Sequence, residues 1–164
     1  MNRFINHPVH SWLGLAARWY LGGVFVFACL HKIAHPAEFA LDVATYDMLP
    51  LSLVNLAALT LPWVELAAGL MLILGWRARG AALACAGMMV VFLVALASAL
   101  HRGLDMSCGC FASQSVAEDD PISYLTVLRD SGWLLLAAYV ALFDRRALGI
   151  DRWLEYRRRR PATA

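Results

Sequence analysis

The stretch GAALACAGMMVVFLVALASAL, residues 80–100, contains no charged side chain and decides the fold class of this chain. A helix of about 20 apolar residues crosses the roughly 30 Å hydrocarbon core of a bilayer. Hydrophobic residues make up 61% of the 164 residues, and the mean hydropathy is +0.61. Soluble domains are about half apolar. The chain is therefore predicted to be an integral membrane protein.

Three other stretches reach the same length. Residues 51–76 carry Glu65 as their only charge, and residues 122–143 are interrupted only by Arg129 and Asp130. We predict an all-α, four-helix membrane bundle that forms a single membrane domain over residues 1–164, because no composition shift marks a second domain. The predicted spans cover about 13–34, 51–76, 80–100 and 122–143, and a basic tail covers 144–164.

The segment PAEFALDVATYDMLP, residues 36–50, predicts a short helix between the first two spans. Pro36 stands at a favourable first helical position. At helical spacing, Phe39, Val43 and Tyr46 share one side, and Glu38 and Asp42 are expected to turn away from it. We expect this helix on the outer membrane surface, where it either roofs a pocket or simply joins two spans.

Arginines are strongly biased to one side of the predicted membrane. With four spans, both termini share the side that collects Arg3, Arg77, Arg79, Arg145, Arg146, Arg152 and residues 157–160. The positive-inside rule makes that side cytoplasmic. The loop after the third span then faces the periplasm of a bacterial inner membrane. The basic charge thus indicates topology and contact with membrane lipids, and does not indicate nucleic-acid binding.

Several polar residues fall inside the predicted spans. Arg18, Gly22, Phe25, Cys29 and Lys32 recur at steps of three and four and so share one face of the first span. Lys32 either points inward with this face or extends to the outer interface.

Glu65 lies near mid-membrane, where a carboxyl group must be protonated, paired or hydrated. Its candidate partners are Lys32 and Arg129. The ion pair would be architectural or functional, and the sequence leaves both open. Cys85, Met88, Met89 and Phe92 in the third span are interpreted as packing residues.

Cys108 and Cys110 stand one glycine apart in the polar loop DMSCGCF, residues 105–111. A disulfide between them would close a very small ring, so it should be strained and easily exchanged. Alternatively, the two thiolates could bind a soft metal ion with His101, or with His31 and His35. The third use is a structural disulfide without redox activity.

These residues resemble a known family. The segments HKIAHPAEFA, LPWVELAAGLMLILG, RGLDMSCGCF and LRD are similar to the MauE branch of the DoxX-like membrane proteins, over about residues 15–143. The resemblance implies a four-helix bundle linked to thiol redox chemistry. It marks Cys108 and Cys110 as the redox pair and Lys32, Glu65 and Arg129 as characteristic polar groups. It also implies maturation of a disulfide-rich dehydrogenase subunit beside a thioredoxin-like partner.

The architecture is also similar to quinone-coupled thiol oxidases of the DsbB and vitamin K epoxide reductase type. Those proteins relay electrons through two cysteine pairs, whereas this chain has one outward pair and a lone Cys29. Either Cys108 and Cys110 contact both partner and acceptor, or the protein does not reduce quinone.

The expected function is that of a membrane thiol-disulfide oxidoreductase or redox maturation factor. It would exchange disulfides with a periplasmic thioredoxin-like protein, with a quinone as one candidate electron acceptor. Arg129 and Lys32 would stabilise the released thiolate, and Glu65 would neutralise charge or accept a proton. The alternatives are a transporter of soft metals or small thiols that captures cargo at the cysteine loop, and a non-catalytic anchor for a maturation enzyme.

Overall fold

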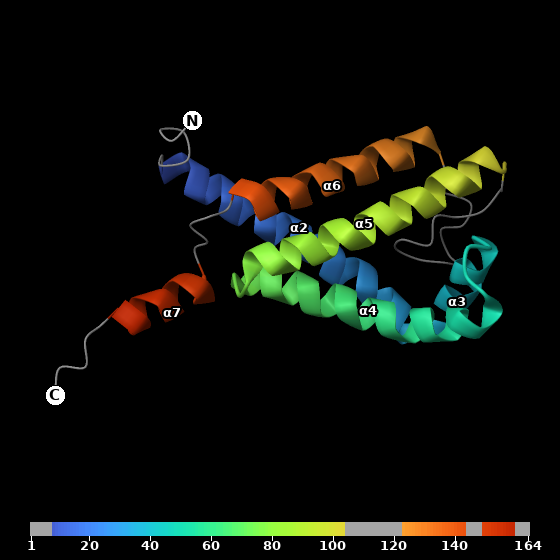
Figure 1. Cartoon of the computed structure of the whole chain (residues 1–164), viewed down its shortest axis with the longest axis horizontal. Helices are drawn as coiled ribbons and strands as arrows, with labels where there is room; N and C mark the ends of the chain where they lie inside the picture. The colour runs from blue at the N-terminus through green and yellow to red at the C-terminus, as the bar shows by residue number, and fades with distance from the viewer. Residues whose placement is uncertain (1–7, 104–122, 144–148, 160–164) are drawn as a thin grey trace.

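The computed structural model describes residues 8–103, 123–143 and 149–159, and this part of the chain is entirely helical (Figure 1). The helices are α2 (Pro8–Ala34), α3 (Pro36–Thr45), α4 (Leu51–Leu74), α5 (Ala78–His101), α6 (Tyr124–Phe143) and α7 (Ile150–Arg159). Four of them, α2, α4, α5 and α6, are long and apolar enough to cross a membrane. The predicted four-helix membrane bundle and the short helix after the first span are confirmed.

The spanning helices pack as two close pairs, α2 with α4 and α5 with α6. The α2–α4 contact depends on two glycines. A Cβ atom on Gly22 would lie 2.8 Å from the carbonyl oxygen of Gly69, and one on Gly69 would lie 3.0 Å from the carbonyl oxygen of Gly22. Small residues allow helix backbones to approach closely in lipid. The two glycines thus set how α2 faces α4.

The core between the helices is built from small and medium side chains that the membrane does not reach. Leu21, Phe25, Leu72, Cys85 and Val140 are buried there. The outward surface is also apolar, with exposed residues that include Trp19, Phe27, Trp63, Val91 and Leu135. Exposed apolar residues on every spanning helix are what a surface in contact with lipid tails requires. Cys85 is a packing residue, as the sequence predicted.

Helix α3 covers one end of the bundle, where α5 ends and α6 begins (Figure 1); we call this the α3 end. Arg102, just past α5, donates a hydrogen bond to the carbonyl oxygen of Tyr46 and lies 3.8 Å from the Asp47 carboxylate. The Tyr46 ring also packs edge-on against Phe92 of α5, with centroids 6.4 Å apart. Helix α3 is therefore held to α5 as well as to the helices that flank it in sequence.

Helix α7 lies at the opposite end, beside the α4–α5 turn (Figure 1). The Asp151 backbone N–H donates to the carbonyl oxygen of Gly75 at 3.1 Å, and its carboxylate accepts from the backbone N–H of Ala78 at 3.4 Å. Gly149 permits this contact, because a Cβ atom there would lie 2.8 Å from the Cα atom of Gly75. The start of α7 is thus attached to the bundle.

Candidate functional site

Lys32 and Glu65 form an ion pair inside the bundle. The Lys32 Nζ atom lies 2.9 Å from Oε1 and 3.0 Å from Oε2 of Glu65, and each side chain is only 11% exposed. Charge-assisted hydrogen bonds of this kind are among the strongest in proteins. Of the two orientations that the sequence left open for Lys32, the structure shows the inward one.

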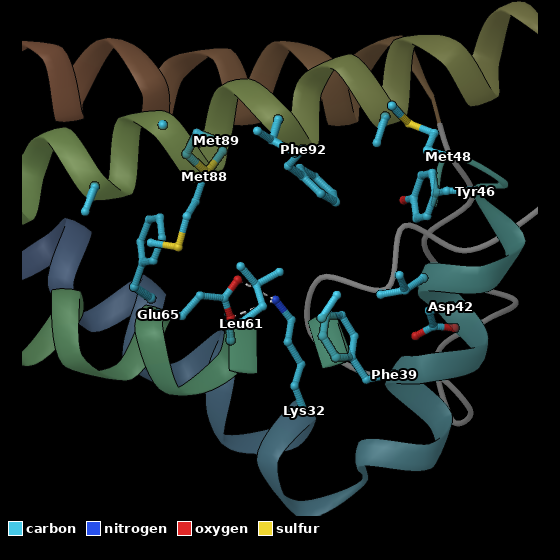
Figure 2. Close-up of a pocket in the computed structure, with 18 of the residues that line it drawn as sticks. Lys32, Phe39, Asp42, Tyr46, Met48, Leu61, Glu65, Met88, Met89 and Phe92 are labelled. Atoms are coloured by element: carbon cyan, nitrogen blue, oxygen red, sulfur yellow. Dashed lines mark hydrogen bonds and ion pairs between the residues drawn. The ribbon is translucent and has the colours of Figure 1, made fainter. Parts of the chain in front are cut away.

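The inward orientation of Lys32 follows from the packing of α2. Arg18, Gly22, Phe25 and Cys29 of the predicted face are all buried. Lys32 lies one turn beyond Cys29, and its side chain extends toward α4 (Figure 2). The Phe39 ring of α3 lies 5.0 Å from Nζ, close enough for a cation–π contact. The Glu65 carboxylate and the Phe39 ring thus replace the water that would surround the Lys32 ammonium group at the membrane interface.

The ion pair lines a cavity of about 500 Å³, a size typical of small-molecule sites. Figure 2 shows the polar ends of Lys32 and Glu65 meeting beside it, with aromatic rings and methionines around them. The wall is almost entirely apolar. It includes Phe25, Leu61 and Trp133 of three spanning helices and Met88, Met89 and Phe92 of α5. Phe39 and Val43 of α3 and Tyr46 just after it also line the cavity, and we call this side its roof.

From the sequence, we predicted that Met88, Met89 and Phe92 are packing residues of the bundle. Met89 does belong to the buried core, and Met88 packs against it. All three nevertheless also line the cavity. Helical periodicity places a residue on an inward face, but it does not distinguish a filled core from a hollow one.

The cavity is bordered by small and exposed residues on α4 and α5. Ala57, Ala84, Gly87 and Val91 line it, and Ala84, Gly87 and Val91 are exposed. These residues belong to membrane-spanning helices, so this border of the cavity lies at the depth of the hydrocarbon core.

The charge on the wall bears on which ligand the cavity can hold. Asp42 lines it together with Lys32 and Glu65. This corrects the prediction that Asp42 turns away, because it stands three residues after Phe39 and so lies near the same side of α3. The charges of Lys32 and Glu65 neutralise each other, and most of the remaining wall is apolar, which suits a neutral ligand.

Arg129 does not pair with Glu65, contrary to one of the two options predicted. Its Nε atom donates to Oδ1 of the adjacent Asp130 at 3.0 Å, and the guanidinium carbon lies 5.0 Å from the Trp133 ring centroid. Trp133 is part of the cavity wall. Arg129 therefore contacts a residue of the cavity wall, and it is not among the residues that line the cavity.

Two buried charges, named in the sequence analysis, had no role assigned to them there. Arg18 on α2 and Asp130 on α6 are both fully buried, and these helices contact each other. The Trp133 indole N–H donates to the Tyr20 hydroxyl at 3.3 Å across the same two helices. The signal for Arg18 was present, since it shares the inward face that ends at Lys32.

Cys108 and Cys110 lie outside the described residues, as do the geometry of their loop and any metal site it forms with His101. The chain enters that loop after Gly103 and leaves it before Ser123, both at the α3 end (Figure 1). Among the described cysteines, Cys29 and Cys85 are buried and free. The Cys29 Sγ atom lies 3.1 Å from the carbonyl oxygen of Val26, one turn earlier in α2.

Comparison with known proteins places the chain in a family. The sequence pattern of the family described as Methylamine utilisation protein MauE matches residues 10–143. The chain is 36% identical to the Methylamine utilization protein MauE of Paracoccus denitrificans over 142 residues, which cover 86% of this chain and 73% of that protein.

Two further relatives carry the same description. The protein of Methylorubrum extorquens is 36% identical over 68% of this chain and 59% of its own length. That of Methylophilus methylotrophus is 28% identical over 92% of this chain and 77% of its own length. No solved structure matches. The chain is a multi-pass membrane protein of the MauE family, the methylamine utilisation proteins.

Proposed function

We propose that this protein is a membrane thiol-disulfide oxidoreductase that serves protein maturation in methylamine utilisation. Cys108 and Cys110 would exchange a disulfide with a thioredoxin-like protein outside the membrane, and a quinone in the cavity would take up the electrons. The names of its relatives support the process. The CGC sequence in a loop between two spans supports the chemistry.

The single observation that carries the proposal is the cavity beside the Lys32–Glu65 pair. A quinone has a neutral planar ring that gains two electrons and two protons, and it carries an isoprenoid tail that stays in lipid. The apolar wall with Phe39, Phe92 and Tyr46 suits the ring. An ammonium group offers three N–H donors, and Glu65 occupies two of them. The third can donate to a quinone carbonyl oxygen.

The proposed reaction balances without another reactant. A thiolate of the partner attacks one sulfur of the Cys108–Cys110 disulfide, and the second partner thiol resolves the mixed disulfide. The partner leaves oxidised, and Cys108 and Cys110 are left as two thiols. Re-forming their disulfide releases two electrons and two protons, which convert quinone to quinol. Glu65 and Lys32 would accept and donate protons at the quinone oxygens.

A metal or small-thiol transporter would need polar groups along its path. The cavity wall is apolar apart from the charged groups near its roof. A hydrated ion gains little from such a surface. The redox proposal is therefore the better match to this cavity.

The thiol step is tested by trapping a mixed disulfide. Cys110→Ser should leave Cys108 joined to a thioredoxin-like protein on non-reducing gels, because the resolving thiol is missing. Cys108→Ser and the double variant should trap nothing. If every variant runs as an unmodified monomer and supports methylamine-dependent growth, the redox proposal is wrong. Loss of bound copper or zinc without trapping would favour transport.

The quinone step is tested with two glycines of α5. Gly87 lines the cavity, Gly80 does not, and a Cβ atom on either would meet nothing within 4 Å. Gly87→Leu should project into the cavity and slow the reduction of a short-tailed ubiquinone by the reduced protein. Gly80→Leu should leave the rate unchanged, and both variants should still exchange disulfides with dithiothreitol. Equal quinone rates in the two variants would remove the quinone from the mechanism.

A further inference from the structure

Three metal-ligating side chains meet at the junction of α2 and α3, outside the cavity. His31 lies in the last turn of α2, His35 lies between the helices, and Glu38 lies in the first turn of α3. A ligand atom from each lies within 4.8 Å of the other two. From the sequence, we considered His31 and His35 only as extra ligands for a metal ion at the cysteine loop, and we assigned no metal-binding role to Glu38.

The backbone holds the three residues on one side of the chain. The His35 N–H donates to the carbonyl oxygen of His31 at 2.9 Å, and the Phe39 N–H donates to that of His35 at 3.2 Å. The helical hydrogen bonding thus continues across the junction, although His35 itself has the non-helical angles φ −127° and ψ 63°. Pro36 disfavours the helical conformation at the residue before it. The junction is therefore a turn that keeps the three residues on one side of the chain.

The three side chains are available to a ligand within the part of the chain that the structure describes. There, none of them makes a hydrogen bond or an ion pair, and the imidazole rings of His31 and His35 only stack, with centroids 4.6 Å apart. Lys32 stands next to His31 but directs its ammonium group to Glu65. No described cation lies against Glu38, so its carboxylate can bind a metal ion without breaking an ion pair.

We propose that His31, His35 and Glu38 form a binding site for a divalent metal ion of the zinc class. Two imidazole nitrogens and one carboxylate oxygen are the protein ligands of many three-ligand zinc sites, with water completing the coordination. Zinc–ligand bonds of about 2.0–2.2 Å place tetrahedral ligands about 3.4 Å apart. Small side-chain rotations bring the present atoms to that distance, because all three already lie within 4.8 Å.

A metal ion at this site would join the end of α2 to the start of α3. Phe39 follows Glu38 directly and lies over the Lys32 ammonium group at 5.0 Å. Metal binding would therefore fix the angle of the roof helix and the position of one wall of the cavity. This effect does not depend on Cys108 and Cys110.

The site is tested by zinc titration of the purified full-length protein in detergent, by calorimetry and by equilibrium dialysis. We expect one zinc ion per chain. His35→Ala and Glu38→Gln should each weaken binding by more than the roughly 10- to 100-fold that the loss of an outer-shell partner costs. His101→Ala is the matched control, because His101 is an exposed histidine at the end of a spanning helix.

The double variant Cys108→Ser, Cys110→Ser separates this site from the cysteine loop. It should bind zinc as the unmodified chain does, and Co²⁺ substituted for zinc should show no thiolate charge-transfer band. Unchanged zinc affinity in both His35→Ala and Glu38→Gln would overturn the proposal. Loss of zinc in His101→Ala or in the double cysteine variant would assign the metal to the loop instead and would also overturn it.

Discussion

The stability of the bundle should depend on Lys32 and Glu65 together rather than on either alone. Both side chains are 11% exposed and are joined by two N–O distances of 2.9 and 3.0 Å. Removing one partner of a buried pair typically costs about 3–5 kcal/mol, because the other charge is left without compensation. Lys32→Met and Glu65→Leu should each lower the free energy of unfolding by about that amount.

The double variant should recover most of the loss. Replacing a whole buried pair by apolar residues of similar volume is often neutral or stabilising. Lys32→Met, Glu65→Leu should therefore be at least as stable as either single variant. Because the double variant should lose little, the coupling energy should be at least as large as the loss in one single variant, about 3–5 kcal/mol, and so exceed the roughly 0.5–3 kcal/mol typical of contacting residues. Glu65→Gln should be milder than Glu65→Ala, since an amide keeps hydrogen bonds to Lys32.

The assay is reversible unfolding in mixed detergent micelles, followed by tryptophan fluorescence, for all four members of the cycle. The Arg102–Asp47 pair provides the control, because its atoms are 3.8 Å apart and the Asp47 side chain is 88% exposed. Exposed pairs contribute about 0–1 kcal/mol. If the two cycles give the same coupling energy, or if the effects at Lys32 and Glu65 simply add, the pair does not stabilise the bundle and the reasoning fails.

Three further predictions concern the packing and the topology. Gly22→Ala should destabilise the protein by about 1–3 kcal/mol, because its Cβ atom would lie 2.8 Å from the Gly69 carbonyl oxygen. Gly23→Ala, whose Cβ atom meets nothing within 4 Å, should be neutral or stabilising in the same unfolding assay. A periplasm-active reporter fused after Ala164 should be silent, and one inserted between α5 and α6 should be active; the reverse pattern would invert the predicted topology. Gly149→Ala should displace α7 and speed deuterium exchange of the Asp151 amide, and unchanged exchange would show that the glycine is not needed there.

The helices could be predicted because their signal is local. The span expected over 51–76 is α4, Leu51–Leu74, and that expected over 80–100 is α5, Ala78–His101. The length of an apolar run is enforced by the thickness of the bilayer, so no tertiary information is needed. Pro36 likewise marks the start of α3, because it favours the first helical turn.

The candidate site could be predicted only in part, because it depends on which helices become neighbours. Periodicity places Lys32 on the same face of α2 as Cys29, but it left open whether Lys32 points inward, as the structure shows that it does. The choice of Lys32 over Arg129 as the partner of Glu65 does not follow, since it depends on the close α2–α4 contact at Gly22 and Gly69. A pocket covered by the short helix was one of two options that the sequence left open, and the structure shows Phe39, Val43 and Tyr46 lining it. Its size and its other walls did not follow, because a hollow is a property of several helices together.

The Lys32–Glu65 pair also constrains the order of events during protein synthesis. The two residues are separated by 33 positions in the chain. At a synthesis rate of about 5–20 residues per second, Glu65 is added roughly 2–7 s after Lys32. The first span therefore reaches the membrane ahead of Glu65 by roughly that time. Lys32 lies close to the end of that span, so it can stay at the lipid headgroups until Glu65 arrives and then turn inward, which lets the charged contact form as soon as the second span has joined the first.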